Sequence, residues 1–199
     1  MDSLYERNEN EEEKEKMLSG QLYDSNVELL ERERNKVKEL CNEYNNIKPS
    51  SKIERKNKLK QILGKIGENI TIEPNFYCDY GYNIEVGENF YSNHNLVILD
   101  PAKVTIGDNV FVGPNCGFYT ASHPMDAITR NRGLEYAKPI TIGNNVWIGG
   151  GVTILPGVTI GDGAVIGAGS VVVASIPTNV LAAGNPCKPI REIDEKKEG

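Results

Sequence analysis

His94 and His123 are the only two histidines in this 199-residue chain, so any chemistry that needs imidazole must use one of them. The four cysteines lie far apart, at positions 41, 78, 116 and 187, and form no CxxC pair. This spacing is typical of neither zinc fingers nor disulfide scaffolds, and it indicates reduced thiols. A zinc site with three histidine ligands cannot be built within one such chain. The sequence therefore predicts no metal centre.

Charge and hydropathy exclude other classes of protein. Lys and Arg total 22 against 28 Asp and Glu, which gives a formal net charge of −6. Capture of nucleic acid depends on basic patches, so we expect no nucleic-acid partner. No stretch approaches the ~18 apolar residues of a membrane span, and the acidic N-terminus lacks the apolar core of a signal peptide. We expect a cytoplasmic protein with no membrane partner.

Residues 1–65 have the pattern of a small helical module that must position part of any site. Apolar side chains recur on one side at helical spacing over residues 26–44, and a second amphipathic segment runs from residue 53 to residue 66. A shorter helix is predicted over residues 11–18. Three residues could cap the 26–44 helix at its start, namely Asp24, Ser25 and Asn26.

From residue 66 to residue 185 the apolar residues recur every six positions. A period of six fits neither a helix nor a hairpin and is the signature of a parallel β-helix of hexapeptide repeats. Branched residues of each unit point inward, and Gly or Asn supplies the turn. Stacked coils then bury continuous apolar columns. The clearest column is Ile142, Ile148, Ile154, Ile160, Ile166 and Val172.

The repeat is interrupted once, over residues 121–138, a polar segment that carries His123 near its start. A loop of this length in a repeat array is usually functional or disordered. The last residues, 186–199, are predicted to form a charged C-terminal tail.

At this point the sequence resembles a known family. The segments PITIGNNVWIGGGVTILPGVTIGDGAVIGAGSVV and AAGNPCKPIREI resemble the left-handed β-helix acetyltransferases. The segments EKEKMLSGQLYD, ERNKVKELCNEYN, YGYNIEVGENFYSNHNLVILD and YTASHP resemble the maltose/galactoside O-acetyltransferase branch. The resemblance covers nearly the whole chain. It implies a left-handed parallel β-helix and a homotrimer with active sites between subunits. It also implies acetyl transfer from acetyl-CoA to a primary hydroxyl of a sugar such as a galactoside, maltose or glucose.

The resemblance also implies three catalytic groups. An alcohol is a poor nucleophile at neutral pH, so a base must take its proton, and a positioned imidazole contributes ~100- to 10,000-fold in rate. His123 in YTASHP matches the family's catalytic histidine. Glu135 is expected to orient the imidazole, and the main-chain amide of Gly150 is expected to stabilise the oxyanion of the tetrahedral intermediate.

Two sets of binding residues follow from the same resemblance. The acceptor sugar is expected to contact Asp24, Arg34, Asp79, Tyr91 and Asn93. Acetyl-CoA is expected to contact Trp147, Gly150, Ala168, Gly169, Lys188 and Arg191.

The sequence departs from the family pattern at several of these places. Asp79 occupies a position that holds a hydroxyl residue in the galactoside type, and Pro101 one that can hold a second carboxylate. Both differences weaken the assignment of galactosides as acceptors. Val173 and Ala174 replace a polar and basic pair often found there, which predicts weaker binding of CoA.

Two alternatives remain open. An acetyltransferase of the same scaffold could act on serine or on a xenobiotic, although such enzymes normally lack the N-terminal EKEKMLSGQLYD segment. A purely structural β-helix would not need a lone histidine in a long loop.

Overall fold

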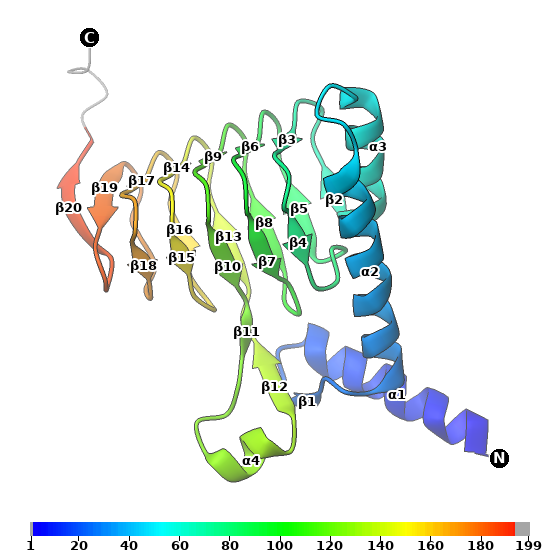
Figure 1. Cartoon of the computed structure of the whole chain (residues 1–199). Helices are drawn as coiled ribbons and strands as arrows, with labels where there is room; N and C mark the ends of the chain where they lie inside the picture. The colour runs from blue at the N-terminus through cyan, green and yellow to red at the C-terminus, as the bar shows by residue number, and fades with distance from the viewer. Residues whose placement is uncertain (1, 194–199) are drawn as a thin grey trace.

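The computed structural model describes residues 2–193 and places a helical module across one end of a long β-helix (Figure 1). The helices of the module are α1 (Asp2–Leu18), α2 (Glu28–Asn46) and α3 (Lys52–Ile62). A two-residue strand, β1 (Tyr23–Asp24), lies between α1 and α2. The predicted fold class, mainly β with a parallel β-helix and a small N-terminal helical module, is confirmed.

Details of the helical module differ from the prediction. The N-cap of α2 is Val27, which provides no side-chain cap. Asp24 instead accepts a hydrogen bond from the main-chain amide of Asn26 at 2.8 Å, which closes a turn ahead of the helix. The predicted caps are therefore wrong. Ile53 is 80% exposed, because α3 buries the face of Arg55, Leu59 and Ile62, and Ile53 lies on the opposite side.

The β-helix has three flat faces, each a stack of short strands that pair in parallel, except that β20 pairs antiparallel with β19. The first face contains β2 (Lys65–Ile66), β5 (Ile84–Val86), β8 (Val104–Ile106), β13 (Ile140–Ile142) and β16 (Thr159–Ile160). The second face contains β3 (Thr71–Ile72), β6 (Tyr91–Ser92), β9 (Phe111–Val112), β14 (Trp147–Ile148), β17 (Val165–Ile166), β19 (Val180–Ala183) and β20 (Lys188–Glu192). The third face contains β4 (Tyr77–Cys78), β7 (Val97–Leu99), β10 (Gly117–Tyr119), β15 (Thr153–Ile154) and β18 (Val171–Val172).

The six-residue period holds because each inward residue stacks on its equivalent one coil away. Ile142 pairs in register with Ile160, and Ile148 pairs with Ile166. All four side chains are buried. Full burial of such a side chain stabilises the fold by about 1.5–3 kcal/mol, so the columns form the core of this narrow domain. The predicted inward phase of the repeat is confirmed.

The corners of the coils are held by ladders of polar side chains. Asn69, Asn89, Asn109 and Asn145 form one amide ladder, with N–O distances of 2.8–3.2 Å. Three of these asparagines have positive φ, from 55° to 57°, which Asn tolerates better than most residues. A carboxylate ladder runs beside it, in which, for example, Asp108 accepts the main-chain amide of Glu88 at 2.7 Å. These ladders fix the turns between the faces.

The interruption of the repeat forms an arm that projects from the β-helix (Figure 1). It consists of β11 (Ala121–Ser122), α4 (Ala127–Asn131) and β12 (Leu134–Ala137). β12 pairs antiparallel with both β11 and β1. The arm therefore joins the helical module in a three-stranded sheet. At the other end, β20 pairs with β19, so part of the predicted tail completes the second face. Residues 194–199 lie outside the described residues.

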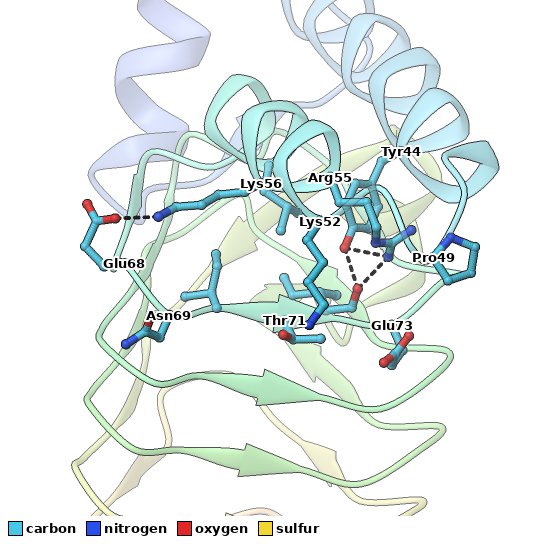
Figure 2. A pocket seen from close by; sticks show the side chains of 12 residues that line it. Tyr44, Pro49, Lys52, Arg55, Lys56, Glu68, Asn69, Thr71 and Glu73 are labelled. Atoms are coloured by element: carbon cyan, nitrogen blue, oxygen red, sulfur yellow. Dashed lines mark hydrogen bonds and ion pairs between the residues drawn. The ribbon is translucent and has the colours of Figure 1, made fainter.

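Buried polar contacts dock the module on the first coil. The Sγ atoms of Cys41 on α2 and Cys78 on β4 lie 3.9 Å apart. Arg55 of α3 donates hydrogen bonds to the hydroxyl of Tyr44 and the carbonyl of Ile72, each at 2.8 Å. Figure 2 shows this contact beside a hollow of about 500 Å³ between α3 and the first coil. The contacts make the module a fixed part of the structure.

Candidate active site

His123 lies at the base of the arm, directly after β11, with its side chain 52% exposed. Its Nδ1 atom lies 3.3 Å from the main-chain carbonyl oxygen of Leu134. A carbonyl oxygen only accepts, so this contact requires the proton on Nδ1 and leaves the lone pair on Nε2. Nε2 lies 4.0 Å from Oε1 of Glu135. The ring is therefore held by strand β12, with one nitrogen free to take a proton.

Glu135 is fixed by two residues of the helical module. The hydroxyl of Tyr23 donates to its Oε2 at 2.8 Å, and the hydroxyl of Ser25 donates to its Oε1 at 3.0 Å. Burial, and then the charge of Glu135, raises the pKa of Tyr23, so this hydroxyl keeps its proton. The contact that fixes the tautomer of His123 comes from Leu134, while the carboxylate of Glu135 faces the other nitrogen. A cation formed on His123 would gain from that charge.

Arg34 extends this network along α2. Its guanidinium donates to the hydroxyl of Tyr80 and to the main-chain carbonyl of Ser25, each at 2.7 Å. Neither partner is a carboxylate, so the charge of Arg34 is not consumed by an ion pair among these contacts. A partly buried guanidinium of this kind can donate further hydrogen bonds to a polar ligand.

Asp79 and Asp100 occupy equivalent turns of successive coils, where the third face leads into the first. Burial raises the pKa of Asp79 to about 6; the nearby charge of Arg34 opposes this shift and that of Glu135 adds to it. Burial also raises the pKa of Asp100 to about 7. We call this region, formed by Asp79, Asp100 and the network of His123, Glu135 and Arg34, the His123 corner. Asp24, whose strand pairs with β12, borders it.

The remaining predicted residues gather elsewhere, on the second face. Tyr91 and Trp147 stand in register on either side of Phe111 in β9. Trp147 is 58% exposed and Phe111 is 52% exposed. Together with Asn93 they line an open groove of about 540 Å³. We call this region, with the turns that follow it at Asn93, Gly150 and 168–169, the Trp147 face. A row of exposed aromatic side chains is typical of a surface that binds a ligand or another protein.

The turns beside the Trp147 face present bare backbone. The amide of Gly150 has no hydrogen-bond partner among residues 2–193, so it is free to donate to a ligand. A Cβ atom at Gly113 would lie 2.4 Å from that amide nitrogen, so glycine keeps the approach to it open. At Gly169 a Cβ would meet nothing within 4 Å. Lys188 and Arg191 are exposed on β20 at the far end of this face. Val173 and Ala174 are exposed directly after β18, where the third face ends.

The structure thus divides the predicted site into two groups on one chain. The turns of Asp79 and Asp100 and the arm all leave the third face toward the first. The turns of Asn93, Gly150 and Ala168 all leave the second face toward the third. One whole face of the prism therefore separates the two groups. The resemblance implied sites between subunits but did not show this division of the residues within one chain. Sequence reasoning missed Tyr23, Ser25, Tyr80, Phe111 and the carbonyl of Leu134.

Comparison with known proteins agrees with this architecture. The maltose acetyltransferase hexapeptide capping motif matches residues 16–67, and the six-repeat bacterial transferase hexapeptide matches residues 139–174. A hexapeptide repeat of succinyl-transferase matches residues 103–120. Galactoside O-acetyltransferase of Escherichia coli K12 is 48% identical, over 92% of this chain and 90% of its own length. The chain belongs to the maltose/galactoside O-acetyltransferase family.

Solved structures extend this result to three dimensions. A maltose O-acetyltransferase from Clostridium difficile 630 is 54% identical and superposes with a TM-score of 0.90, covering 92% of this chain and 98% of that one. A galactoside acetyltransferase in complex with coenzyme A is 48% identical, with a TM-score of 0.88 and coverage of 92% and 91%. The protein is an acetyl-CoA-dependent acetyltransferase of this family.

Within residues 2–193, no cluster of three or more His, Cys, Asp or Glu side chains is placed to bind a metal ion. None of the helices described has both the length and the apolar character needed to cross a bilayer.

Proposed function

We propose that this family member transfers the acetyl group of acetyl-CoA to a primary hydroxyl of a sugar such as maltose, glucose or a galactoside. The observation that carries the proposal is the His123 corner. There an imidazole with a free Nε2 lies beside carboxylates, a guanidinium and two tyrosines. Polar groups of these types pair with several hydroxyls at once, which suits a sugar.

The reaction needs one base and one oxyanion donor. Nε2 of His123 takes the proton of the sugar hydroxyl while the oxygen attacks the thioester carbonyl. Negative charge develops on the carbonyl oxygen, and the unpaired amide of Gly150 is suited to stabilise it. The intermediate then collapses, the carbon–sulfur bond breaks, and the thiolate of CoA takes the proton from His123. Glu135, 4.0 Å from Nε2, favours the transient imidazolium.

The division of the site supports a homotrimer. His123 and the oxyanion donor Gly150 lie at different corners of one chain, so a working site needs the His123 corner of one subunit beside the Trp147 face of the next. A ring of three such heterologous contacts closes on itself and gives three sites. The exposed Trp147 and Phe111 would then cover CoA and the neighbouring subunit.

An acceptor panel tests the proposal. Release of CoA thiol is measured with maltose, glucose, methyl galactoside, serine and chloramphenicol. We expect turnover with at least one sugar and none with serine or chloramphenicol, and the reverse pattern would contradict the proposal. Static light scattering is expected to give three chains per particle, and an active monomer would contradict the shared site.

A further inference from the structure

Asp100 is a buried carboxyl group that neither the repeat nor the reaction explains. Its side chain is 0% exposed, in the turn between β7 and β8. Its Oδ2 is the one buried side-chain oxygen or nitrogen without a hydrogen-bond partner in the described part of the chain. A buried polar atom left unpaired destabilises a fold by about 1–3 kcal/mol, so its presence calls for an explanation.

The other oxygen of Asp100 performs a specific task. Oδ1 accepts hydrogen bonds from two successive main-chain amides of the preceding coil, those of Asp79 at 3.0 Å and Tyr80 at 2.9 Å. The two donors belong to the turn that carries Asp79 into the His123 corner. One buried oxygen therefore fixes the main chain from which two site residues project.

Both residues of that turn lead to the acceptor side of the site. The hydroxyl of Tyr80 accepts a hydrogen bond from Arg34 at 2.7 Å. Beyond the effect of burial, the charge of Arg34 lowers the pKa of Asp79, and the charge of Glu135 raises it. A shift of the turn would move Asp79 directly and would move Arg34 through Tyr80. It would leave His123, which follows β11, held by Leu134 of β12.

We propose that Asp100 is a positioning residue for the acceptor, which it does not touch, because it holds the turn that presents Asp79 and Tyr80. This inference rests on the proposed function, since it names the sugar as the ligand of that corner. It assigns Asp100 to the binding of the acceptor and not to that of acetyl-CoA, whose predicted contacts lie on the Trp147 face.

The test separates the accepting oxygen from the charge of the carboxyl group. Asp100→Ala removes the acceptor of both amides, whereas Asp100→Asn keeps an oxygen at the position of Oδ1. Initial rates are measured on the full-length protein with acetyl-CoA and the sugar of the panel that has the highest kcat/KM. We expect Asp100→Ala to raise the KM for that sugar about tenfold or more, with the KM for acetyl-CoA changed less than about threefold. Asp100→Asn is expected to restore the KM for the sugar to within about threefold of wild type.

Asp108→Ala is the matched control. Asp108 also accepts a main-chain amide of the preceding coil, that of Glu88 at 2.7 Å, but it lies at a different corner. It should leave the KM for the sugar unchanged. If Asp100→Ala does not fold, Asp100→Leu fills the same space without an acceptor and is measured instead.

Three outcomes would overturn the proposal. They are an unchanged KM for the sugar in the folded Asp100→Ala or Asp100→Leu protein, an equal rise in both KM values, and failure of both variants to fold, which would make Asp100 a residue of general stability. Wild-type protein that acetylates no sugar would instead contradict the proposed function.

Discussion

The His123 corner and the Trp147 face are built in opposite ways. At the His123 corner, residues of α2, β1, the arm and two turns are joined by hydrogen bonds, and carboxyl groups and one guanidinium lie in the same region. At the Trp147 face, aromatic rings stand exposed on a regular sheet and the adjoining turns offer main-chain atoms. The first region suits a small ligand with many hydroxyls. The second suits a long ligand that lies along a surface.

The two regions also depend on the six-residue repeat to different degrees. Every residue of the Trp147 face occupies a fixed position of a six-residue unit, so the regular coils place it without further help. The His123 corner exists only where the repeat is interrupted and where the N-terminal module meets the arm. Substitutions at the two regions should therefore change different kinetic constants.

The largest effect is expected from His123→Ala. Loss of the base should lower kcat at least ~100-fold, while the KM for acetyl-CoA stays within about threefold of wild type, because His123 does not belong to the Trp147 face. Steady-state rates of thiol release measure both constants. His94→Ala is the control, since His94 is an exposed turn residue. If His123→Ala kept the kcat of wild type, His123 would not be the general base.

Trp147→Ala should act on the other region. Loss of an aromatic contact is expected to raise the KM for acetyl-CoA about tenfold and to leave the KM for the sugar nearly unchanged. Trp147→Phe should recover most of the affinity, because a ring remains. If the KM for the sugar rose by the same factor as that for acetyl-CoA, the division of labour between the two regions would be wrong.

A smaller effect is expected from Glu135→Gln. Gln keeps one oxygen that accepts a hydrogen bond from one of the two hydroxyls of Tyr23 and Ser25, and its NH2 group can donate to the other hydroxyl, so the arm should keep its place and the fold its stability. The charge facing Nε2 of His123 is lost, and kcat should fall about three- to tenfold. Circular dichroism checks the fold, and initial rates check kcat. An unchanged kcat would show that Glu135 only supports the arm.

The smallest effect is expected in how the free energy of unfolding of Asp100→Asn, relative to wild type, changes with pH. Burial raises the pKa of Asp100 to about 7, above the ordinary value of about 3.9 for an unfolded chain. The folded state thus holds the proton more tightly, so the contribution of Asp100 to stability is greatest below about pH 4 and is lost as the pH rises to about 7. Asp100→Asn should become more stable relative to wild type across that window.

Urea unfolding at pH 4.5 and pH 7.5 measures this difference. The control is Asp108→Asn, because exposed Asp108 also accepts a main-chain amide but is not buried. A stability difference between Asp100→Asn and wild type that does not change with pH would show that Asp100 keeps its charge in the fold.

Most of the β-helix could be predicted because its code is local and repeated. An inward Ile or Val every six residues fixes the phase of every coil, and the structure buries the whole column of Ile142 to Val172. Trp147 and the Gly150 turn could be placed for the same reason. The amphipathic pattern likewise indicated α2 and α3, although it did not show that Ile53 would point to solvent.

The His123 corner could be predicted only in part, because its contacts join distant parts of the chain. The hydrogen bond from Tyr23 to Glu135 spans 112 residues and depends on the pairing of β1 with β12. β1 has only two residues and therefore carries no periodic pattern, so its pairing with β12 could not be predicted from the sequence. For the same reason the carbonyl of Leu134 could not be foreseen as the partner of His123.

The central claim is that one catalytic site combines the His123 corner of one chain with the Trp147 face of another. It is tested by co-assembling two impaired chains in equal amounts, one with His123→Ala and one with Asn93→Ala and Trp147→Ala, and by measuring rates at acetyl-CoA well below the wild-type KM. In randomly mixed trimers about one quarter of the interfaces would pair two intact regions. We predict recovery of about one quarter of wild-type activity. Mixtures no more active than the separate variants would contradict the account, because they would place the complete site within a single chain.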